Sequence, residues 1–190
     1  MSRIVITGNP GVGKRTLSSM LSKRLGFKII NLNEFVIKNR LVFTDKTLDV
    51  YDVHLKKATL MLRREIKQYQ DVIITGHLAP YLLMPDQVDL VVVLRRSPEN
   101  LLQTFKKRNY DLRKIRENIT SEILGITLYD SMKKFGKEMI IEFDTTTTPS
   151  KEIIKHLIEA LSDESKRKTE NIDWMPTLKD RQEILKLVSY

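Results

Sequence analysis

The stretch GNPGVGKRT at residues 8–16 follows directly on the apolar run IVIT at residues 4–7, and this order decides the fold. The apolar run has the composition of a buried strand, and the residues after Gly13 have helical apolar spacing. Glycines between a strand and a helix permit positive φ angles and let bare backbone approach a ligand. Because the first amides of a helix lack intrahelical partners, the stretch predicts a loop that binds phosphate groups.

The spacing of three residues carries this prediction. Gly11 and Gly13 shape the turn, and Lys14 supplies a positive charge for the outer phosphates. An ordinary glycine-rich turn is the alternative, but the complete G-x-x-x-x-G-K spacing favours phosphate binding. Arg15 stands where such loops usually have a Ser or Thr that touches magnesium, and Thr16 comes one residue later. This Lys-x-Thr order is similar to that of nucleoside-monophosphate kinases rather than switch GTPases, and it leaves the handling of the metal open.

Four further apolar runs, at residues 27–31, 72–75, 90–94 and 140–144, are typical of buried strands. Their continuous apolarity indicates burial on both faces, as in a parallel sheet covered by helices. The intervening sequence predicts helices over 34–38, 49–70, 97–108, from the basic segment to about 124, and 150–161. The chain is therefore expected to have an α/β P-loop NTPase fold with a five-stranded parallel sheet flanked by helices.

The length of 190 residues and a hydrophobic content of 41% fit one globular domain, which we expect over residues 1–162. Residues 163–190 are predicted as a charged linker and a helical tail. The tail, with an apolar set at Leu178, Leu185 and Val188, is expected to form a separate appendage. Trp174 is interpreted as an aromatic anchor that pins the tail to the core rather than as a partner-binding residue.

The formal net charge is +9, and its distribution is uneven. Residues 1–40 carry eight basic and one acidic side chain, and residues 95–137 carry eleven and five. Clustered positive charge raises the local concentration of anions, so this surplus fits an anionic substrate. It fits contact with RNA equally well, and charge alone does not choose between the two.

The chain has no cysteine, which excludes disulfides, a cysteine-zinc lid and thiol catalysis. No apolar run approaches the length of a membrane span, and no charged-then-apolar leader precedes Ile4. We therefore expect a cytoplasmic protein without a membrane partner.

A family resemblance rests on the loop, on His77, on VVLR at residues 92–95 and on RNYDLRKIRENITSEILG at residues 108–125. Together these segments resemble the adenylate kinase isoenzyme six family, whose members act late in the maturation of the small ribosomal subunit. The last segment is the most specific, and it departs from the family pattern at Asn109, where the family has glycine. The resemblance covers residues 1 to about 161.

The resemblance implies a nucleoside-monophosphate kinase fold with a monophosphate-binding lobe at about 31–54 and a short lid at about 108–118. It implies adenylate kinase and ATPase activity with ATP and Mg²⁺ as cofactors. The implied partners are AMP or another nucleoside monophosphate and a small-subunit ribosomal protein of the platform, and the positive charge is compatible with an rRNA contact. Carried over by position, Gly11, Gly13, Lys14, Arg15 and Thr16 line the ATP phosphates, and Arg108 begins the lid.

Four side chains are predicted to be catalytic: Lys14, His77, Arg95 and Arg108. Arg108 would close over the β and γ phosphates, because a guanidinium binds phosphate at two points. Arg95 follows a buried strand at the sheet edge where ligands bind in α/β folds. Exposed charge at a helix start is the alternative for Arg95 and the preferred interpretation of Arg96. His77 would orient an attacking water or sense the γ phosphate, unless it is a loop histidine satisfied by backbone groups.

No residue is assigned as a metal ligand. In the family an acidic residue two positions before the histidine helps to hold hydrated magnesium, and here that position is Thr75. Glu34 is the best substitute, because Asp71 and Asp89 precede their strands and lie at the other end of the sheet. Lys38 and Arg40 are candidate contacts for the acceptor phosphate.

Three functional readings remain. The first is a magnesium-dependent ATP–AMP phosphotransferase with ATPase activity in ribosome assembly. The second is a nucleotide-gated module that binds a ribosomal protein or rRNA with little kinase flux, and the departures at Arg15 and Thr75 favour it. The third, a small-metabolite kinase of shikimate or cytidylate type, does not account for residues 108–125.

Overall fold

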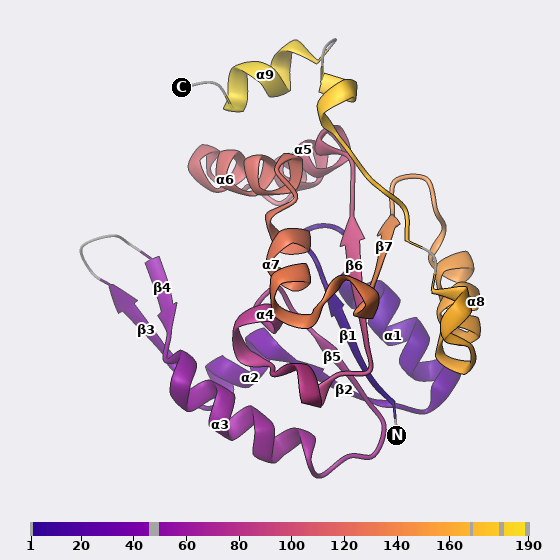
Figure 1. Cartoon of the computed structure of the whole chain (residues 1–190). Helices are drawn as coiled ribbons and strands as arrows, with labels where there is room; N and C mark the ends of the chain where they lie inside the picture. The colour runs from indigo at the N-terminus through magenta and orange to yellow at the C-terminus, as the bar shows by residue number, and fades with distance from the viewer. Residues whose placement is uncertain (1, 46–49, 168, 179–180, 189–190) are drawn as a thin grey trace.

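The structure is a computed structural model of the chain, and it describes residues 2–45, 50–167, 169–178 and 181–188. Figure 1 shows a central sheet covered by helices on both faces, with the C-terminal helix at one end of the molecule. None of the helices in these ranges is long and apolar enough to cross a membrane.

Five parallel strands form the central sheet in the order β2-β5-β1-β6-β7. The strands are β1 (Arg3–Thr7), β2 (Lys28–Asn31), β5 (Val72–Thr75), β6 (Leu90–Arg95) and β7 (Ile140–Asp144). In the register, Val5 of the central strand lies opposite Ile74 on one side and Val91 on the other. The predicted α/β fold with a five-stranded parallel sheet is therefore confirmed.

Successive residues of the strands supply two separate hydrophobic clusters, one on each face of the sheet. Ile4 and Ile6 belong to the cluster under α1, α5, α6 and α8, and Val5 belongs to the cluster under α2, α3 and α4. All three side chains are fully buried. The helices are α1 (Lys14–Leu25), α2 (Leu32–Lys38), α3 (Leu55–Ile66), α4 (Ala79–Leu82), α5 (Pro98–Lys107), α6 (Leu112–Ile123), α7 (Ile126–Phe135) and α8 (Ser150–Ser162).

Local sequence explains where several helices begin. Ser97 caps α5, because its Oγ accepts a hydrogen bond from the amide of Asn100 at 3.3 Å. Asp111 caps α6 in the same way, accepting from the amide of Lys114 at 2.8 Å. The predicted helices over 97–108, up to about 124 and over 150–161 are confirmed, as is the short helix around 34–38.

The long helix predicted over 49–70 is wrong in its first part. Residues Val50–Val53 form strand β4, which pairs antiparallel with β3 (Val42–Asp45), and α3 begins only at Leu55. Asp49 lies outside the described residues. Three of the four residues of Val-Tyr-Asp-Val are β-branched or aromatic, and this preference for a strand outweighs the helical spacing that begins at Val53.

Helix α7 was not predicted from the sequence. It follows Gly125, whose φ of 63° lies in the left-handed region and separates α6 from α7. The helix packs against α4, β6 and β7, and its Phe135 joins the hydrophobic cluster of Val5.

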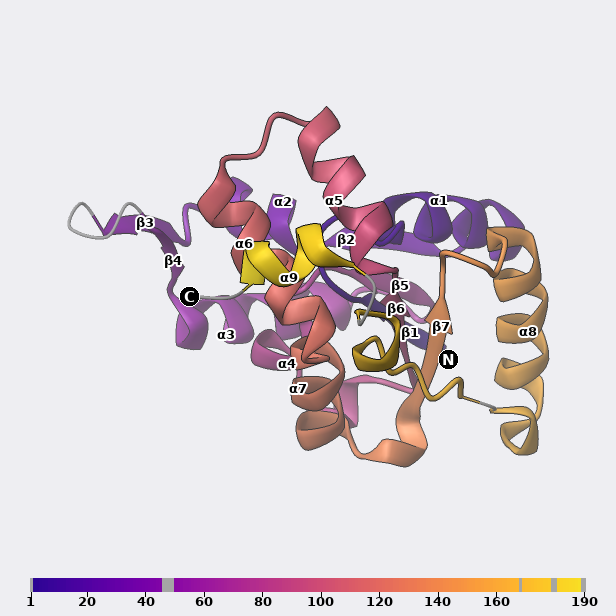
Figure 2. The ribbon, with the colours of Figure 1, turned by 90° about the horizontal axis from the view of Figure 1, so that it is seen from above.

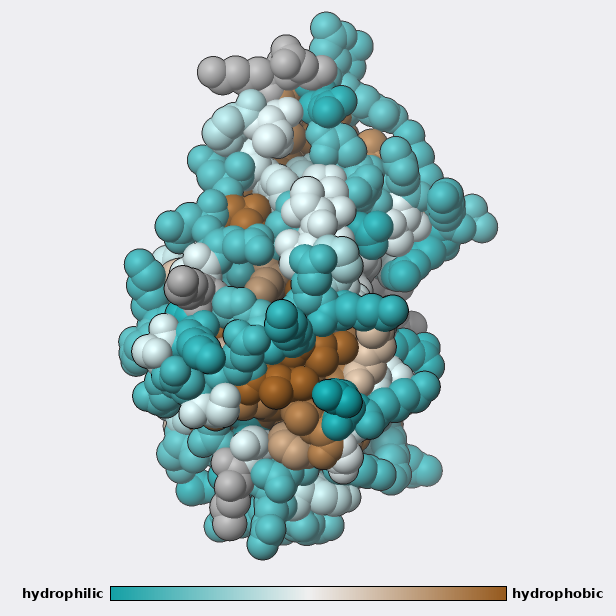
Figure 3. Space-filling model, turned by 90° about the vertical axis from the view of Figure 1, so that its right-hand side faces the viewer, coloured by the Kyte–Doolittle hydropathy of each residue, from teal (hydrophilic) through white to brown (hydrophobic). Residues whose placement is uncertain are grey.

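The described part of the C-terminal segment, residues 169–178 and 181–188, packs on the core and is not a separate appendage. Trp174, Leu178 and Ile184 are buried, and the last two belong to the cluster under α1 and α5. Helix α9 (Gln182–Val188) packs against α6, and Figure 2 shows it lying across the α5–α6 pair. The interpretation of Trp174 as an anchor is thus confirmed, whereas the predicted independence of the tail is wrong. Figure 3 shows that the side bearing α8 is largely hydrophilic, with one large hydrophobic area in the lower half of the view and smaller ones above it.

Candidate functional site

The loop between β1 and α1 has the backbone shape that its glycines predict. Gly11 has a φ of 88° and Gly13 a φ of 99°, both in the region that side chains rarely adopt. A Cβ added at Gly8 would lie 2.3 Å from the carbonyl oxygen of Leu94, so this position has no space for one. Gly13 is the N-cap of α1 and provides no side-chain acceptor for the first amides of the helix. These amides suit an anionic ligand.

Lys14 lies directly at this loop. Its Nζ donates hydrogen bonds to the carbonyl oxygens of Gly8 at 2.7 Å and Asn9 at 2.8 Å. Burial lowers the pKa of Lys14 from 10.5 to about 8, while Glu122 opposes this shift and Arg108 adds to it. The ammonium is therefore a desolvated cation held against the phosphate-binding loop.

A cavity of about 360 Å³ opens beside the loop at the carboxyl ends of β2 and β5. It brings Glu34 and Thr75 together with Lys14, although the three come from different segments of the chain. Its lining residues are Lys14, Arg15, Ser18, Ser19, Ile29, Asn31, Asn33, Glu34, Thr75 and Gly76. We refer to it as the loop cavity.

The loop cavity has donors that suit a hydrated magnesium ion. Glu34 is exposed and accepts a hydrogen bond from the side-chain amide of Asn31 at 2.9 Å, and the hydroxyl of Thr75 lies at the end of β5. Magnesium keeps several waters and needs only one or two carboxylates when phosphates supply further oxygens, so this donor set fits it. Within the described ranges no three His, Cys, Asp or Glu side chains gather as a metal cluster.

Asp71 and Asp89 lie at the opposite end of the sheet, as the sequence predicted. Asp71 accepts a hydrogen bond from the amide of Ser2 at 2.7 Å, and Asp89 accepts one from the amide of Arg3 at 2.8 Å. Both carboxylates therefore tie down the start of β1 and are remote from the loop.

A second cavity, of about 760 Å³ and largely apolar, adjoins the loop cavity. It lies between α2, the β3–β4 hairpin and the turn after β5, and Asn33 lines both cavities. Its lining residues are Asn33, Val36, Ile37, Arg40, Val42, Val53, His77 and Leu78. Lys38 is absent from both linings, whereas Arg40 is present in this one. We call this space the apolar cavity.

His77 stands where the cavities approach the loop. It lines the apolar cavity and also a smaller space of about 220 Å³ that Asn9 and Pro10 share. Although the residue is exposed by its surface area, desolvation and the nearby Lys14 ammonium lower the pKa of His77 below 6.5. The neutral imidazole is therefore favoured at pH 7.

Arg108 ends α5 and begins the turn to α6. Its side chain is exposed, and no ion pair involves it within the described part of the chain. Its charge is close enough to contribute to the lowered pKa of Lys14. Asn109 follows with a φ of 52°, a conformation that Asn tolerates better than most residues, which explains how it replaces glycine.

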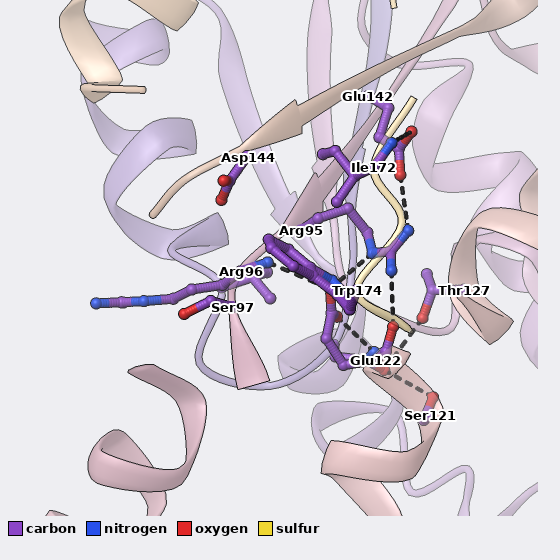
Figure 4. Close-up of polar contacts among 12 residues, drawn as sticks. Arg95, Arg96, Ser97, Ser121, Glu122, Thr127, Glu142, Asp144, Ile172 and Trp174 are labelled. Atoms are coloured by element: carbon purple, nitrogen blue, oxygen red, sulfur yellow. Dashed lines mark hydrogen bonds and ion pairs between the residues drawn. The ribbon is translucent and has the colours of Figure 1, made fainter. Parts of the chain in front are cut away.

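The expectation that Arg95 reaches a ligand does not agree with the structure. Its guanidinium is buried, and Nε donates to Glu122 at 2.6 Å while Nη1 donates to Glu142 at 2.7 Å (Figure 4). A third bond, from Nη2 to the carbonyl oxygen of Glu122, occupies the rest of the fork. The residue does follow strand β6, but these partners hold its side chain inside the protein and away from both cavities.

The preferred interpretation of Arg96 as an exposed charge is also wrong. Its side chain is partly buried, and Nη1 donates to the carbonyl oxygen of Gly11 in the loop at 3.2 Å. Arg96 therefore supports the loop from outside the cavities.

Sequence reasoning missed Glu122 and Asn9, which are hydrogen-bonded at 2.8 Å and both buried. A signal for Glu122 was present. It continues the buried stripe of α6 at Ile115 and Ile119, so a carboxylate stands where helical spacing calls for an apolar residue.

The chain is similar to one family model and to several archaeal proteins. The family model described as an AAA domain matches residues 4–125. A protein of Methanocaldococcus jannaschii named "Putative adenylate kinase" is 36% identical over 173 residues, covering 90% of this chain and 92% of that protein. A protein of the same name from Pyrococcus furiosus is 32% identical, covering 90% of each chain.

Solved structures share the fold at lower identity. The YorR protein from Bacillus subtilis, in complex with phosphorylated GDP, has a TM-score of 0.62 at 18% identity, covering 86% of this chain and 98% of its own. Shikimate kinase from Acinetobacter baumannii has a TM-score of 0.56 at 19% identity, covering 88% and 96%.

Proposed function

Because this chain belongs to the family of the archaeal proteins named "Putative adenylate kinase", we propose that it transfers the γ-phosphoryl group of ATP to a nucleoside monophosphate, with AMP as the first candidate. One observation supports this most directly: the loop cavity and the apolar cavity adjoin at Asn33. A phosphate-binding loop next to an apolar space of nucleoside size suits a donor and an acceptor bound side by side.

The donor phosphates would lie on the amides at the start of α1, where Gly13 leaves the backbone open. Lys14, Arg15 and Thr16 would contact their oxygens, and Lys14 would exchange its bonds with the loop carbonyls for bonds to phosphate. Glu34 and Thr75 would hold the waters of a magnesium ion, which supplies neutralising charge between the phosphates.

The acceptor nucleoside would occupy the apolar cavity, in the lobe proposed at residues 31–54. Val36, Ile37 and Val53 would contact the base, and Arg40 is the cation available to the phosphate. An oxygen of the acceptor phosphate would form a bond to the γ-phosphorus as the bond to the β-phosphate oxygen breaks, so that two diphosphates result. Neutral His77, between the cavity and the loop, would orient the attacking group.

Arg108 would complete the site by closing over the transferring phosphate, with residues 108–118 as the lid. Its exposed guanidinium begins a turn of four residues between α5 and α6, so a small rotation of this turn suffices to move it. Closure would bring a second cation to the phosphates and exclude water, which favours transfer over hydrolysis.

A second candidate function is a nucleotide-gated ATPase module of ribosome assembly. The observation that favours it is Thr75, because a neutral hydroxyl in the loop cavity leaves Glu34 to hold the metal waters. In this reading a cytoplasmic chain binds ATP, alters its grip on a small-subunit ribosomal protein of the platform or on rRNA, and hydrolyses ATP slowly. The basic segments 1–40 and 95–137 would face the anionic partner.

A coupled assay separates the two candidates. ATP is supplied with each nucleoside monophosphate in turn and also alone, and ADP formation is followed. ADP formation that depends on a monophosphate supports the kinase, whereas turnover indifferent to every acceptor supports the ATPase module. Recovery of the ribosomal protein in a pull-down with and without ATP tests the module directly, and equal recovery argues against nucleotide gating.

Replacement of the loop lysine tests the assigned site. Lys14→Ala should reduce turnover by about a hundred-fold or more, because the cation that contacts the outer phosphates is lost. Lys23→Ala, at an exposed position in the last turn of the same helix, is the matched control and should retain full activity. Near-normal turnover in Lys14→Ala would contradict the assignment of the loop.

A further inference from the structure

Asn9 is the loop residue whose side chain turns into the protein instead of towards a ligand. It is buried, and its Oδ1 accepts hydrogen bonds from the hydroxyls of Ser121 at 3.0 Å and Thr127 at 3.2 Å. Its Nδ2 donates to Glu122 at 2.8 Å. The side-chain amide is thus held by residues of α6 and α7, which lie more than a hundred residues after Asn9 in the sequence.

Glu122 is the centre of this support. Its side chain is fully buried, and its Oε2 accepts from Asn9 while its Oε1 accepts from Arg95 at 2.6 Å and from the indole Nε1 of Trp174 at 3.0 Å. The amide of Arg96 donates to the same Oε1 at 3.2 Å. A buried carboxylate is tolerated only when its oxygens are satisfied in this way, so each donor depends on the others being in place.

The C-terminal segment closes this network on its outer side. Trp174 covers Glu122, and the amide of Ile172 donates to Glu142, the second carboxylate partner of Arg95, at 3.4 Å. Thr169 accepts from the amide of Glu142 at 3.0 Å. Figure 4 shows Trp174 and Ile172 lying over Arg95 and its two carboxylates. Three charged side chains are therefore shielded from water by residues 169–174.

The network leads back to the residues that would contact phosphate. Before nucleotide binds, Lys14 donates to the carbonyl oxygen of Asn9, so the position of residue 9 sets the place from which the ammonium would reach the phosphates. Arg96, whose amide bonds Glu122, donates through its side chain to Gly11. Two points of the loop, Asn9 and Gly11, are thus held by groups that both bond the carboxylate of Glu122.

We propose that Glu122 is a positioning residue of the phosphate-binding loop, and that the C-terminal segment completes the donor site by placing Trp174 on that carboxylate. The proposal rests on the proposed function in that it takes the loop to bind the donor nucleotide. Glu122 touches no ligand itself. It acts through Asn9, and the tail acts through Glu122, so nucleotide affinity depends on residues far from the cavities.

The test uses titration calorimetry of the full-length chain and measures binding of ADP while AMP saturates the acceptor site, and binding of AMP alone. Trp174→Phe removes the N–H donor and keeps an aromatic ring in place. Asn9→Asp sets a second carboxylate against Glu122. Each should raise the Kd for ADP about five-fold or more, because a hydrogen bond to a buried charged group is lost or replaced by repulsion. The Kd for AMP should change by less than about two-fold, since no residue of the network lines the apolar cavity.

A double variant identifies the contact itself. Combining Asn9→Asp with Glu122→Gln restores one carboxylate and one amide in reversed order, so the Kd for ADP should return towards that of the parent. If the two residues act independently of each other, the two losses add. Arg181→Ala is the matched control in the same segment, because it removes only an exposed ion pair with Glu99 and should leave ADP binding unchanged.

The outcomes separate this inference from the proposed function. If the parent chain binds ADP and the single variants bind it equally well, or if the double variant is no better than its parents, the inference is overturned and the proposed function stands. Parallel losses for ADP and AMP also overturn it, because they indicate general destabilisation. Absence of ADP binding by the parent chain overturns both.

Discussion

A lysine buried beside a phosphate cradle loses its charge at a lower pH than an exposed lysine. The pKa of Lys14 is lowered to about 8, so the ammonium is present below that pH and is lost as the pH rises through it. We expect the Kd for ADP to increase between about pH 7 and pH 9, measured by titration calorimetry. Lys14→Arg keeps its charge throughout and should show no alkaline increase, even if its affinity is lower overall. The same increase in both proteins would contradict the assignment to Lys14.

Glu34 is the carboxylate of the loop cavity, and its charge should determine the magnesium concentration that activity requires. Glu34→Gln retains the oxygen that accepts from Asn31 and removes the charge. We expect the magnesium concentration for half-maximal activity to rise several-fold while ADP binding without magnesium stays the same. Glu152→Gln, at an exposed position in α8, is the control. An unchanged magnesium requirement in Glu34→Gln would mean that other groups hold the ion.

At the level of elements, the turn between α5 and α6 depends on one backbone conformation. Asn109 has a φ of 52°, which glycine adopts freely and β-branched residues adopt at a cost. Asn109→Val should therefore lower the free energy of unfolding by about 1–2 kcal/mol, measured by urea denaturation. The family that the sequence resembles has glycine at this position. Asn109→Gly should therefore leave stability nearly unchanged. Equal stability in both variants would show that the turn readily adopts another conformation.

The β3–β4 hairpin shows how an element can be misassigned when two periodicities overlap. Helical spacing from Val53 through Leu60 to Ile66 is real, and it belongs to α3 and the residue that ends β4. The extended segment before it has strand-forming residues, but its pairing partner, β3, ends at Asp45, on the other side of residues 46–49. Antiparallel pairing supplies backbone hydrogen bonds that the sequence of one strand alone does not reveal.

At the level of the whole molecule, the tail should be required for stability. Removal of residues 163–190 would expose the Arg95–Glu142 pair and uncover the cluster that Leu178 and Ile184 help to fill. Each fully buried apolar side chain contributes about 1.5–3 kcal/mol, so we expect a loss of roughly 5 kcal/mol or more once Trp174 is included. Urea denaturation of the shortened and full-length chains measures this loss. An unchanged urea midpoint of unfolding would show that the tail does not contribute to stability and would support the prediction of a separate appendage.

The sequence by itself determined the phosphate-binding loop, all five strands of the sheet and most of the helices. These features depend on neighbouring residues: glycines within a few positions of Lys14, continuous apolar runs, and caps such as Ser97. It also named Glu34 as the substitute for the acidic residue that is missing at Thr75, and both residues line the loop cavity.

Only the tertiary structure decided where the charges of Arg95 and Glu122 go and what the tail covers. The partners of Arg95 lie 27 and 47 residues away, and Asn9 and Glu122 are 113 residues apart. An arginine at a strand end can turn towards a ligand or into the protein, and local sequence is the same in both cases. The packing of α6 and the C-terminal segment selects between them, because a buried carboxylate needs several donors that only the folded chain brings together.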